Sequence, residues 1–466
     1  MPVPLWGSDV LNYAAMIVMK FGGTSVEDAR AIRSVVEIVL SRRQQKPVVI
    51  VSAMAKITDS LLAVVRHAAD RRLDDALSTI EKMRSRHHDA AKELVTADRL
   101  NAVISKIDDR LQGIENLARS LAVLGESTAR SQDAIVSQGE MLSSLLVTEA
   151  LIQQGAPGVL ADSREFIITD GQFTKAVPQM TAIIERTERI LGDFLSKGQI
   201  PVTQGFVGST ANGVTTTLGR GGSDYSAALI GAALKAEEIQ IWTDVDGMMT
   251  TDPRVVPEAR RIEAVSFDEA AELAYFGAKV LHPSTVLPAI EREIPVRILN
   301  TKRPSVPGTL ITSDPKPSQT PIKSIAFRRN VVVLNVSSAR MLEAHGFLKA
   351  IFEIFDRFRT SVDVVSTSEV SVSMTIEATD RLDEITGELS RLGRVTVEQD
   401  KAIICVVGDN LKSTSGIAGR LFTCLDNINI SMVSQGASKI NLTFVCDNAN
   451  VEKAVRQLHS QFFPNS

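Results

Sequence analysis

Apolar and polar positions along the chain follow two different periods. Residues 15–23, AMIVMKFGG, are a short apolar run that ends in glycines, and residues 27–43 carry apolar side chains at helical spacing. A second β-branched run follows at residues 47–54. Strand, helix and strand at this spacing predict a parallel sheet. The pattern returns three times, so we expect an α/β fold whose open, mostly parallel sheet has helices on both faces, with further strands in residues 199–208, 237–247 and 292–300.

Two stretches interrupt this pattern. Residues 70–134 are long, polar and helical in their spacing, and are predicted to be a helical insertion. At residues 312–321, TSDPKPSQTP, proline, serine and threonine replace the apolar period. This composition is typical of a linker between domains.

The region beyond the linker contains an internal duplication. The order strand, helix, strand, strand, helix occurs twice, as in ferredoxin-like α+β units. Residues 394–400 are the one spare strand, so the two modules are expected to share or exchange strands. The alternative is two unrelated small α+β pieces. The predicted parts are an extension at 1–15, a catalytic domain at 16–311, a linker at 312–322, and modules at 323–392 and 393–466.

Composition limits the classes of partner. The 466 residues exceed what one core usually supports. Lys and Arg number 51 against 55 Asp and Glu, and a net charge of −4 gives no general attraction for nucleic acid or an anionic membrane. Three scattered cysteines indicate neither a disulfide framework nor a metal site. The first fifteen residues lack the pattern of a secretory signal, so we expect a cytoplasmic protein.

The first candidate site is a glycine turn after the first strand. It reads Lys20-Phe21-Gly22-Gly23-Thr24-Ser25. Backbone N–H groups of a glycine turn and a helix N-terminus favour phosphate oxygens, and Lys20 adds a positive charge for a phosphoryl group. A glycine turn after a strand is common, so this turn alone leaves a structural role open.

A second turn, Gly219-Arg220-Gly221-Gly222, leads into Ser223, Asp224 and an alanine-rich helix. The chain has neither a P-loop nor a dinucleotide fingerprint, and two glycine turns in one sheet suit a triphosphate held from both sides. Arg220 presents a planar fork of donors suited to a carboxylate, which suggests a small acid as acceptor. A carboxylate is already ionised at neutral pH, so its phosphorylation needs no general base.

Five motifs in order resemble those of the aspartate kinases. They are KFGGTSV, SQGEMLSS at 137–144, TLGRGGSDYSAA at 217–228, WTDVDGMMTTDPR at 242–254 and FGAKVLHP at 276–283. The resemblance covers the chain from Met16 onward, and the two terminal modules look like the paired ACT domains of that family. It implies an amino acid kinase fold and ATP-dependent phosphorylation of L-aspartate to 4-phospho-L-aspartate, the first step towards lysine, threonine and methionine.

The resemblance also implies roles for residues of this chain. Lys20 would neutralise the γ-phosphate, oriented by Asp224, while Glu140 would bind the substrate ammonium and Arg220 a carboxylate. The whole set for aspartate is Thr58, Glu140, Phe206, Arg220 and Ser223. The set for ATP, which would bring Mg through its phosphates, is Gly22, Gly23, Thr24, Ser25, Gly221, Gly222, Thr243, Asp244, Met249, Asp252, Arg254 and Lys279. Met249 stands where many relatives have tyrosine, so adenine packing is expected to be looser.

The first terminal module resembles the effector site of lysine-inhibited aspartate kinases. Asp363 could pair with a ligand amine, while glycine backbone and hydroxyl groups take its carboxylate. The predicted set is Met341, His345, Gly346, Phe347, Leu348, Ser361, Val362, Asp363, Thr367, Ser368 and Glu369. An acidic strand end is the alternative for Asp363. Such modules pair their sheet edges between chains, so a homodimer is expected, with a tetramer also open.

Two other functions are considered. One is a kinase of the same fold that acts on glutamate, N-acetylglutamate or a nucleoside monophosphate. The other is an amino-acid-binding regulator with an inactive kinase domain, against which the intact Lys20, Arg220 and Asp224 argue.

Overall fold

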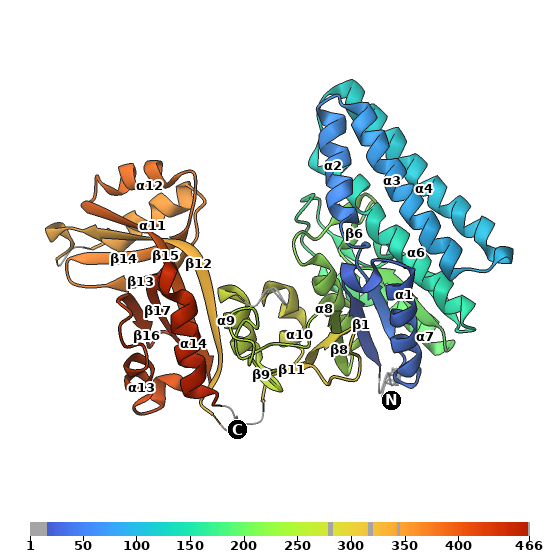
Figure 1. The fold of residues 1–466 in the computed structure, drawn as a ribbon. Helices are drawn as coiled ribbons and strands as arrows, with labels where there is room; N and C mark the ends of the chain where they lie inside the picture. The colour runs from blue at the N-terminus through green and yellow to red at the C-terminus, as the bar shows by residue number, and fades with distance from the viewer. Residues whose placement is uncertain (1–15, 278–282, 316–319, 343–344, 465–466) are drawn as a thin grey trace, which may run out of the picture. The chain divides into compact units, whose positions relative to one another are not determined.

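The computed structural model describes residues 16–277, 283–315, 320–342 and 345–464. The chain divides into two compact units (Figure 1). The first comprises Met1–Gly247 and Leu281–Ser313, and the second comprises Met248–Val280 and Asp314–Ser466, each over its described residues. The second unit therefore includes a segment, 248–280, that the sequence places inside the predicted catalytic domain. The predicted extension at 1–15 and residues 316–319 of the predicted linker lie outside the described residues.

The main sheet of the first unit has the order β3-β5-β2-β1-β8-β10-β11. Its neighbouring strands are parallel except for the antiparallel pair of β10 and β11. The residues of β1 and β2 are all buried, as expected of strands covered on both faces. The predicted open, mostly parallel sheet is confirmed. Its strands are β1 Ile17–Phe21, β2 Val48–Val51, β3 Gly158–Ala161, β5 Ile200–Gln204, β8 Glu238–Thr243, β10 Val296–Asn300 and β11 Thr309–Thr312.

Helices surround this sheet, and α3 and α4 form the long hairpin expected of the insertion (Figure 1). A small second sheet, in the order β4-β6-β7, lies in the same unit. Its strands are Ile168–Thr169, Val207–Thr210 and Thr215–Thr217. The helices are α1 Ala29–Ser41, α2 Ile57–Ala69, α3 Leu73–Leu94, α4 Ala97–Leu124, α5 Ala129–Val136, α6 Gln138–Gln153, α7 Met180–Ser196, α8 Gly222–Leu234 and α10 Leu287–Glu291.

One helical stretch in the described residues, Ala129–Gln153, is long and apolar enough to cross a membrane. It comprises α5 and α6, and 89% of its apolar window is buried inside the protein. Its apolar composition is explained by packing, since α6 is buried on nearly every side.

The second unit contains one antiparallel sheet in the order β13-β14-β12-β15-β17-β16. Its strands are β12 Ile322–Ser337, β13 Val362–Thr367, β14 Ser371–Glu377, β15 Arg394–Gly408, β16 Ile430–Gln435 and β17 Asn441–Asp447. The same unit contains the short strand β9, Ala264–Ser266, and the helices α9 Phe267–Phe276, α11 Phe347–Arg357, α12 Leu382–Leu389, α13 Ile417–Thr423 and α14 Val451–Phe462.

The duplicated modules exchange strands. The long strands β12 and β15 pair with each other along most of their lengths. Val332 and Leu334 of β12 pack in one core with α11 and α12, whereas Ile322 and Ile325 of the same strand pack in the other core with α13 and α14. Residues 394–400 are the first half of β15 rather than a separate strand. The start of β12 thus contributes to the second module, although the sequence assigns it to the first.

The segment 248–277, which follows Gly247, is hydrogen-bonded and ion-paired to this sheet. Thr251 donates its hydroxyl to the carbonyl of Ile325 at 2.8 Å, and Ser324 donates to the carbonyl of Met249 at 2.8 Å. The side chains of Lys323 and Glu269, only 4% and 3% exposed, form an ion pair of 2.7 Å between β12 and α9. Glu269 also accepts a hydrogen bond from the backbone N–H of Ser266, which caps α9. Segment 248–277 is therefore an integral part of the second unit.

The buried ion pair leads to a stability prediction. Lys323→Met leaves the charge of Glu269 buried without its partner, which costs about 3–5 kcal/mol. Adding Glu269→Gln keeps the cap of α9, removes the charge and is expected to restore most of the loss. Thermal and urea unfolding of the second unit measures both changes. The control is Lys349→Met, which breaks an exposed pair with Glu353 and costs at most about 1 kcal/mol. Equal losses for Lys323→Met and the control would contradict the prediction.

Candidate active site

The first glycine turn closes directly after β1. The backbone N–H of Gly22 donates to the carbonyl of Trp242 at 3.0 Å, and residues Gly23–Val26 form a short 3-10 helix. A Cβ added to Gly23 would lie 2.9 Å from the carbonyl oxygen of Ala53. Only glycine lets the loop after β2 approach so closely, and the N–H of Ala55 then donates to the carbonyl of Gly23 at 3.1 Å.

The second glycine turn leads into α8. Gly219 and Gly221 have φ angles of 79° and 70°, which side chains rarely adopt. The helix begins at Gly222, where a Cβ would lie 2.6 Å from the ring of Phe206. Phe206 is held in turn, because its N–H donates to the hydroxyl of Ser226 at 2.9 Å. The predicted residues Phe206, Gly221 and Gly222 therefore lie together.

An ion pair joins the two turns. Nζ of Lys20, near the end of β1, lies 2.6 Å from Oδ1 of Asp224 in the first turn of α8. The two side chains are 11% and 13% exposed, so the pair is largely shielded from water. A carboxylate in the first turn of a helix is also stabilised by the helix dipole. Close to this pair along the chain, Ser223 is partly buried and Arg220 is exposed.

A groove of about 730 Å³ runs beside the first turn. Four of the predicted nucleotide residues line it, namely Thr24, Ser25, Thr243 and Asp244. Thr301 and Lys302 line it as well, although neither belongs to a motif recognised in the sequence. The hydroxyls of Ser25 and Thr301 lie 2.7 Å apart in a hydrogen bond across the groove wall. Lys302 adds a positive charge to this groove, which is also lined by Thr24 and Ser25 of the short helix after the first glycine turn.

Glu140 is a buried carboxyl at the start of α6. It is 3% exposed, and its Oε2 has no hydrogen-bond partner within the described part of the chain. Burial raises the pKa of Glu140 to about 8, against the opposing effect of backbone hydrogen bonds from Ala53 and Glu140 itself. Gly139 lies against the side chain of Ala53, so Glu140 borders the same loop as Gly23. Thr58, in the first turn of α2, follows that loop and is partly buried.

Asp133 is a residue that the sequence analysis missed. It is 1% exposed, and its carboxylate accepts hydrogen bonds from the hydroxyl of Thr217 at 2.7 Å, the N–H of Thr217 at 3.0 Å and the N–H of Thr174 at 2.9 Å. Thr217 ends β7, two residues before the second glycine turn. Asp133 thus positions the strand that delivers Arg220. An acidic residue on the apolar side of a helix is its only signal in the sequence.

Arg86, in the middle of the insertion helix α3, was also missed. Its guanidinium donates to the carbonyl of Ala55 and to the carbonyl of Glu27, both at 2.7 Å. These carbonyls flank the first glycine turn on its two sides. The helical insertion therefore braces the loops around the candidate phosphate site.

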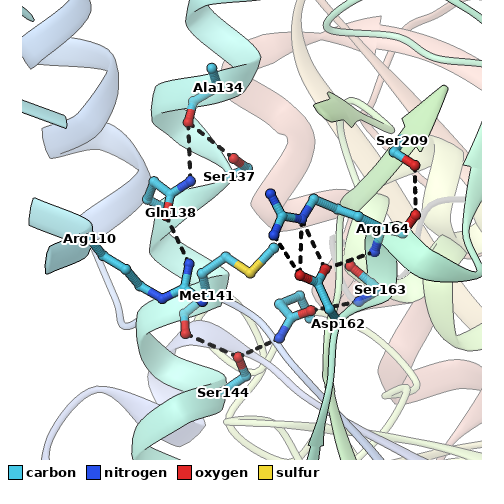
Figure 2. Close-up of polar contacts among 11 residues, drawn as sticks. Arg110, Ala134, Ser137, Gln138, Met141, Ser144, Asp162, Ser163, Arg164 and Ser209 are labelled. Carbon is cyan, nitrogen blue, oxygen red and sulfur yellow. Dashed lines mark hydrogen bonds and ion pairs between the residues drawn. The ribbon is translucent and has the colours of Figure 1, made fainter. Parts of the chain in front are cut away.

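A second cavity, of about 600 Å³, lies between α4, α6 and β3. Gln138 lines this cavity. Its side chain accepts a hydrogen bond from Arg110 at 3.2 Å and donates to the carbonyl of Ala134 at 3.4 Å (Figure 2). Nearby, Asp162 pairs with Arg164 at 2.5 Å. The residues that line this cavity include none of the predicted site residues.

Some predicted nucleotide residues belong to the other compact unit. Met249, Asp252 and Arg254 lie in the second unit, where Arg254 pairs with Asp252 at 2.6 Å and its side chain is 88% exposed. Lys279 lies outside the described residues. The part of the chain that the structure describes contains no cluster of three His, Cys, Asp or Glu side chains that could hold a metal ion.

The predicted effector residues lie around the start of α11 and along β13 in the second unit. Gly346 caps α11 with a φ of 82°, while His345 and Leu348 are exposed. Met341, Phe347 and Val362 border the same apolar core. The carboxylate of Asp363 is 2% exposed and accepts hydrogen bonds from Arg328, at 3.1 Å, and from the hydroxyl of Tyr275. Ser361, Thr367, Ser368 and Glu369 complete the set on β13 and its flanks.

Comparison with known proteins agrees with this arrangement. The model of the amino acid kinase family matches residues 15–300, and an ACT domain model matches residues 404–462. The lysine-sensitive aspartokinase 3 of Escherichia coli (strain K12) is 39% identical over 460 residues, which cover 96% of this chain and 99% of that protein.

Two crystal structures of E. coli aspartokinase III are similar to the whole chain. The R-state complex with aspartate and ADP has a TM-score of 0.82 and 38% identity, covering 96% of this chain and 100% of that one. The T-state complex with lysine and aspartate has the same TM-score and identity, covering 97% and 100%. Similarity of this extent, in both sequence and structure, shows that the chain belongs to the aspartokinases.

Proposed function

We propose that this aspartokinase transfers the γ-phosphoryl group of ATP to the side-chain carboxylate of L-aspartate, producing 4-phospho-L-aspartate. The observation that carries the assignment of roles is the ion pair of Lys20 and Asp224 between two glycine turns. An ammonium group at this point neutralises charge on the transferring phosphoryl group, and Asp224 holds it in place. The structure of the E. coli relative with aspartate and ADP supports the choice of substrates.

The acceptor is positioned rather than activated. Its side-chain carboxylate is ionised at neutral pH, so attack on phosphorus needs alignment and charge neutralisation. We assign one substrate carboxylate to the exposed fork of Arg220 and the substrate ammonium to Glu140, with Thr58, Phe206 and Ser223 around them. The unpaired, buried Oε2 of Glu140 supports this role, because an ammonium group would satisfy it.

The groove beside Gly22 and Gly23 suits the nucleotide. The start of the short helix after Gly22 favours phosphate oxygens, and Lys302 is a further cation at the lining. Mg brought by ATP would neutralise phosphate charge and be held mainly through the phosphates. Met249, Asp252, Arg254 and Lys279 remain predicted nucleotide contacts, with Met249 a flexible replacement for an aromatic ring.

The first test removes the positive charge at the centre of the site. Lys20→Met is expected to lower kcat/KM by roughly 10²–10³-fold, because charge on the transition state loses its partner. Steady-state ADP release with aspartate, glutamate, N-acetylglutamate and nucleoside monophosphates measures activity and substrate choice. Lys46→Met, a change at an exposed lysine before β2, is the matched control. Activity of Lys20→Met equal to that of this control would exclude the assigned role.

The second test uses the raised pKa of Glu140. Only the ionised carboxylate binds the substrate ammonium, and with a pKa of about 8 the ionised fraction rises about fivefold between pH 7 and pH 8. The KM for aspartate should therefore fall about fivefold over this interval and level off above it. Glu140→Gln should lose this dependence, and the KM for ATP serves as an internal control. A KM for aspartate that is flat from pH 7 to pH 9 would contradict the role.

We further propose that lysine inhibits the enzyme through the first ACT module, and that the chain acts as a homodimer. The T-state complex of the E. coli relative with lysine supports the choice of effector. Val370 and Val433, apolar residues exposed on or beside strands of the sheet, support pairing between copies. A cytoplasmic location stays a prediction.

The third test addresses the effector. Millimolar lysine is expected to lower the rate of the wild type, while Asp363→Asn retains the basal rate and loses the inhibition, because a neutral amide pairs weakly with the effector ammonium. Rates with lysine and with threonine are compared over the same concentrations. An unchanged rate with lysine, together with inhibition by threonine, would reject the assignment.

A further inference from the structure

Asp363 has one engaged and one free carboxylate oxygen. Oδ1 accepts hydrogen bonds from the guanidinium of Arg328, at 3.1 Å, and from the hydroxyl of Tyr275. Oδ2 is buried and has no hydrogen-bond partner among the described residues. A buried carboxylate oxygen left unpaired is costly, so this atom marks the place where a donor is missing.

Arg328 has a second carboxylate within reach. Its Nη1 lies 3.3 Å from Oε1 of Glu377, whose side chain is 75% exposed. The guanidinium also lies over the ring of Tyr275, 4.6 Å from its centre, and donates to the backbone carbonyl of Tyr275. Arg328 can therefore remain paired with Glu377 and Tyr275 when Asp363 acquires another cation.

Tyr275 lies in the last turn of α9, next to the point where the chain returns to the kinase unit. The start of α9 is fixed by its capping box and by the ion pair of Glu269 with Lys323. Its end is held to the first ACT module by the contacts of Tyr275 with Asp363 and Arg328. The kinase unit resumes at Leu281, six residues after Tyr275.

We propose that Tyr275 and Arg328 sense whether the effector site at Asp363 is occupied. An ammonium group that pairs with the free Oδ2 draws the carboxylate away from the hydroxyl of Tyr275, and the end of α9 is released. Arg328 remains paired with Glu377. The inference rests on the proposed lysine assignment. It adds the residues that couple binding of an effector at Asp363 to the end of α9, a few residues before the chain returns to the kinase unit.

The proposal has a definite sign. The bond between Tyr275 and Asp363 stabilises the effector-free arrangement alone, so its removal favours the arrangement that binds lysine. Tyr275→Phe should therefore bind lysine more tightly, with Kd and the half-inhibiting concentration both lowered roughly tenfold, as expected for a hydrogen bond to a charged group. General damage to the fold would weaken binding instead.

The experiment is calorimetric titration of lysine into the full-length enzyme, paired with inhibition curves and a thermal melt of each variant. Arg357→Gln is the matched control, since its ion pair with Glu388 lies between α11 and α12 of the same module and contacts neither Tyr275 nor Asp363. Tighter binding by Tyr275→Phe, with the control unchanged, supports the proposal. Unchanged or weaker binding overturns it while the lysine assignment stands. No lysine binding by the wild type overturns both.

Discussion

The reaction proposed for this chain depends on one ion pair, between Lys20 near the end of a buried strand and Asp224 in the first turn of a buried helix. Each partner alone would be an uncompensated charge in a nearly dry place, so neither is retained without the other. The pair also links β1 to the first turn of α8, so it joins the two elements that carry the glycine turns. In the proposed reaction, a phosphate chain beside this pair would meet a cation already in place, so little reorganisation would be needed when charge develops.

The surroundings of this pair explain why so many small residues cluster there. Gly23 and Gly222 are required because a carbonyl oxygen and a phenyl ring occupy the space of a side chain. The insertion contributes from outside the sheet, through Arg86 on the loops of the first turn and Asp133 on the strand before the second. The helices of the insertion therefore hold in place the loops beside the first turn and the strand before the second.

The sequence predicted the parallel sheet, the helical insertion and the duplicated modules well, because each depends on local periodicity. Lys20 and Asp224 could be proposed as site residues because each stands beside a glycine turn in a short motif, whereas their meeting in one ion pair follows from the fold. Asp133 and Arg86 were missed because their hydrogen-bond partners lie far away in the sequence. Tyr275 and Lys302 were missed for a similar reason, since their positions follow from tertiary packing.

The two compact units do not follow the order of the segments along the chain. Apolar periodicity cannot tell which core a strand or helix joins, so segment 248–280 was assigned by its neighbours in sequence. Packing of Val255 and Val256 in the core of the second ACT module assigns it to the other unit.

The exchanged strands β12 and β15 have a consequence for how this protein can evolve. Each strand contributes side chains to both apolar cores, so neither repeat can form a complete core without the other. Recombination that excised one copy would leave the other with half a core and a bare sheet edge. Changes that keep both cores intact are therefore confined to substitutions within the paired strands and their helices.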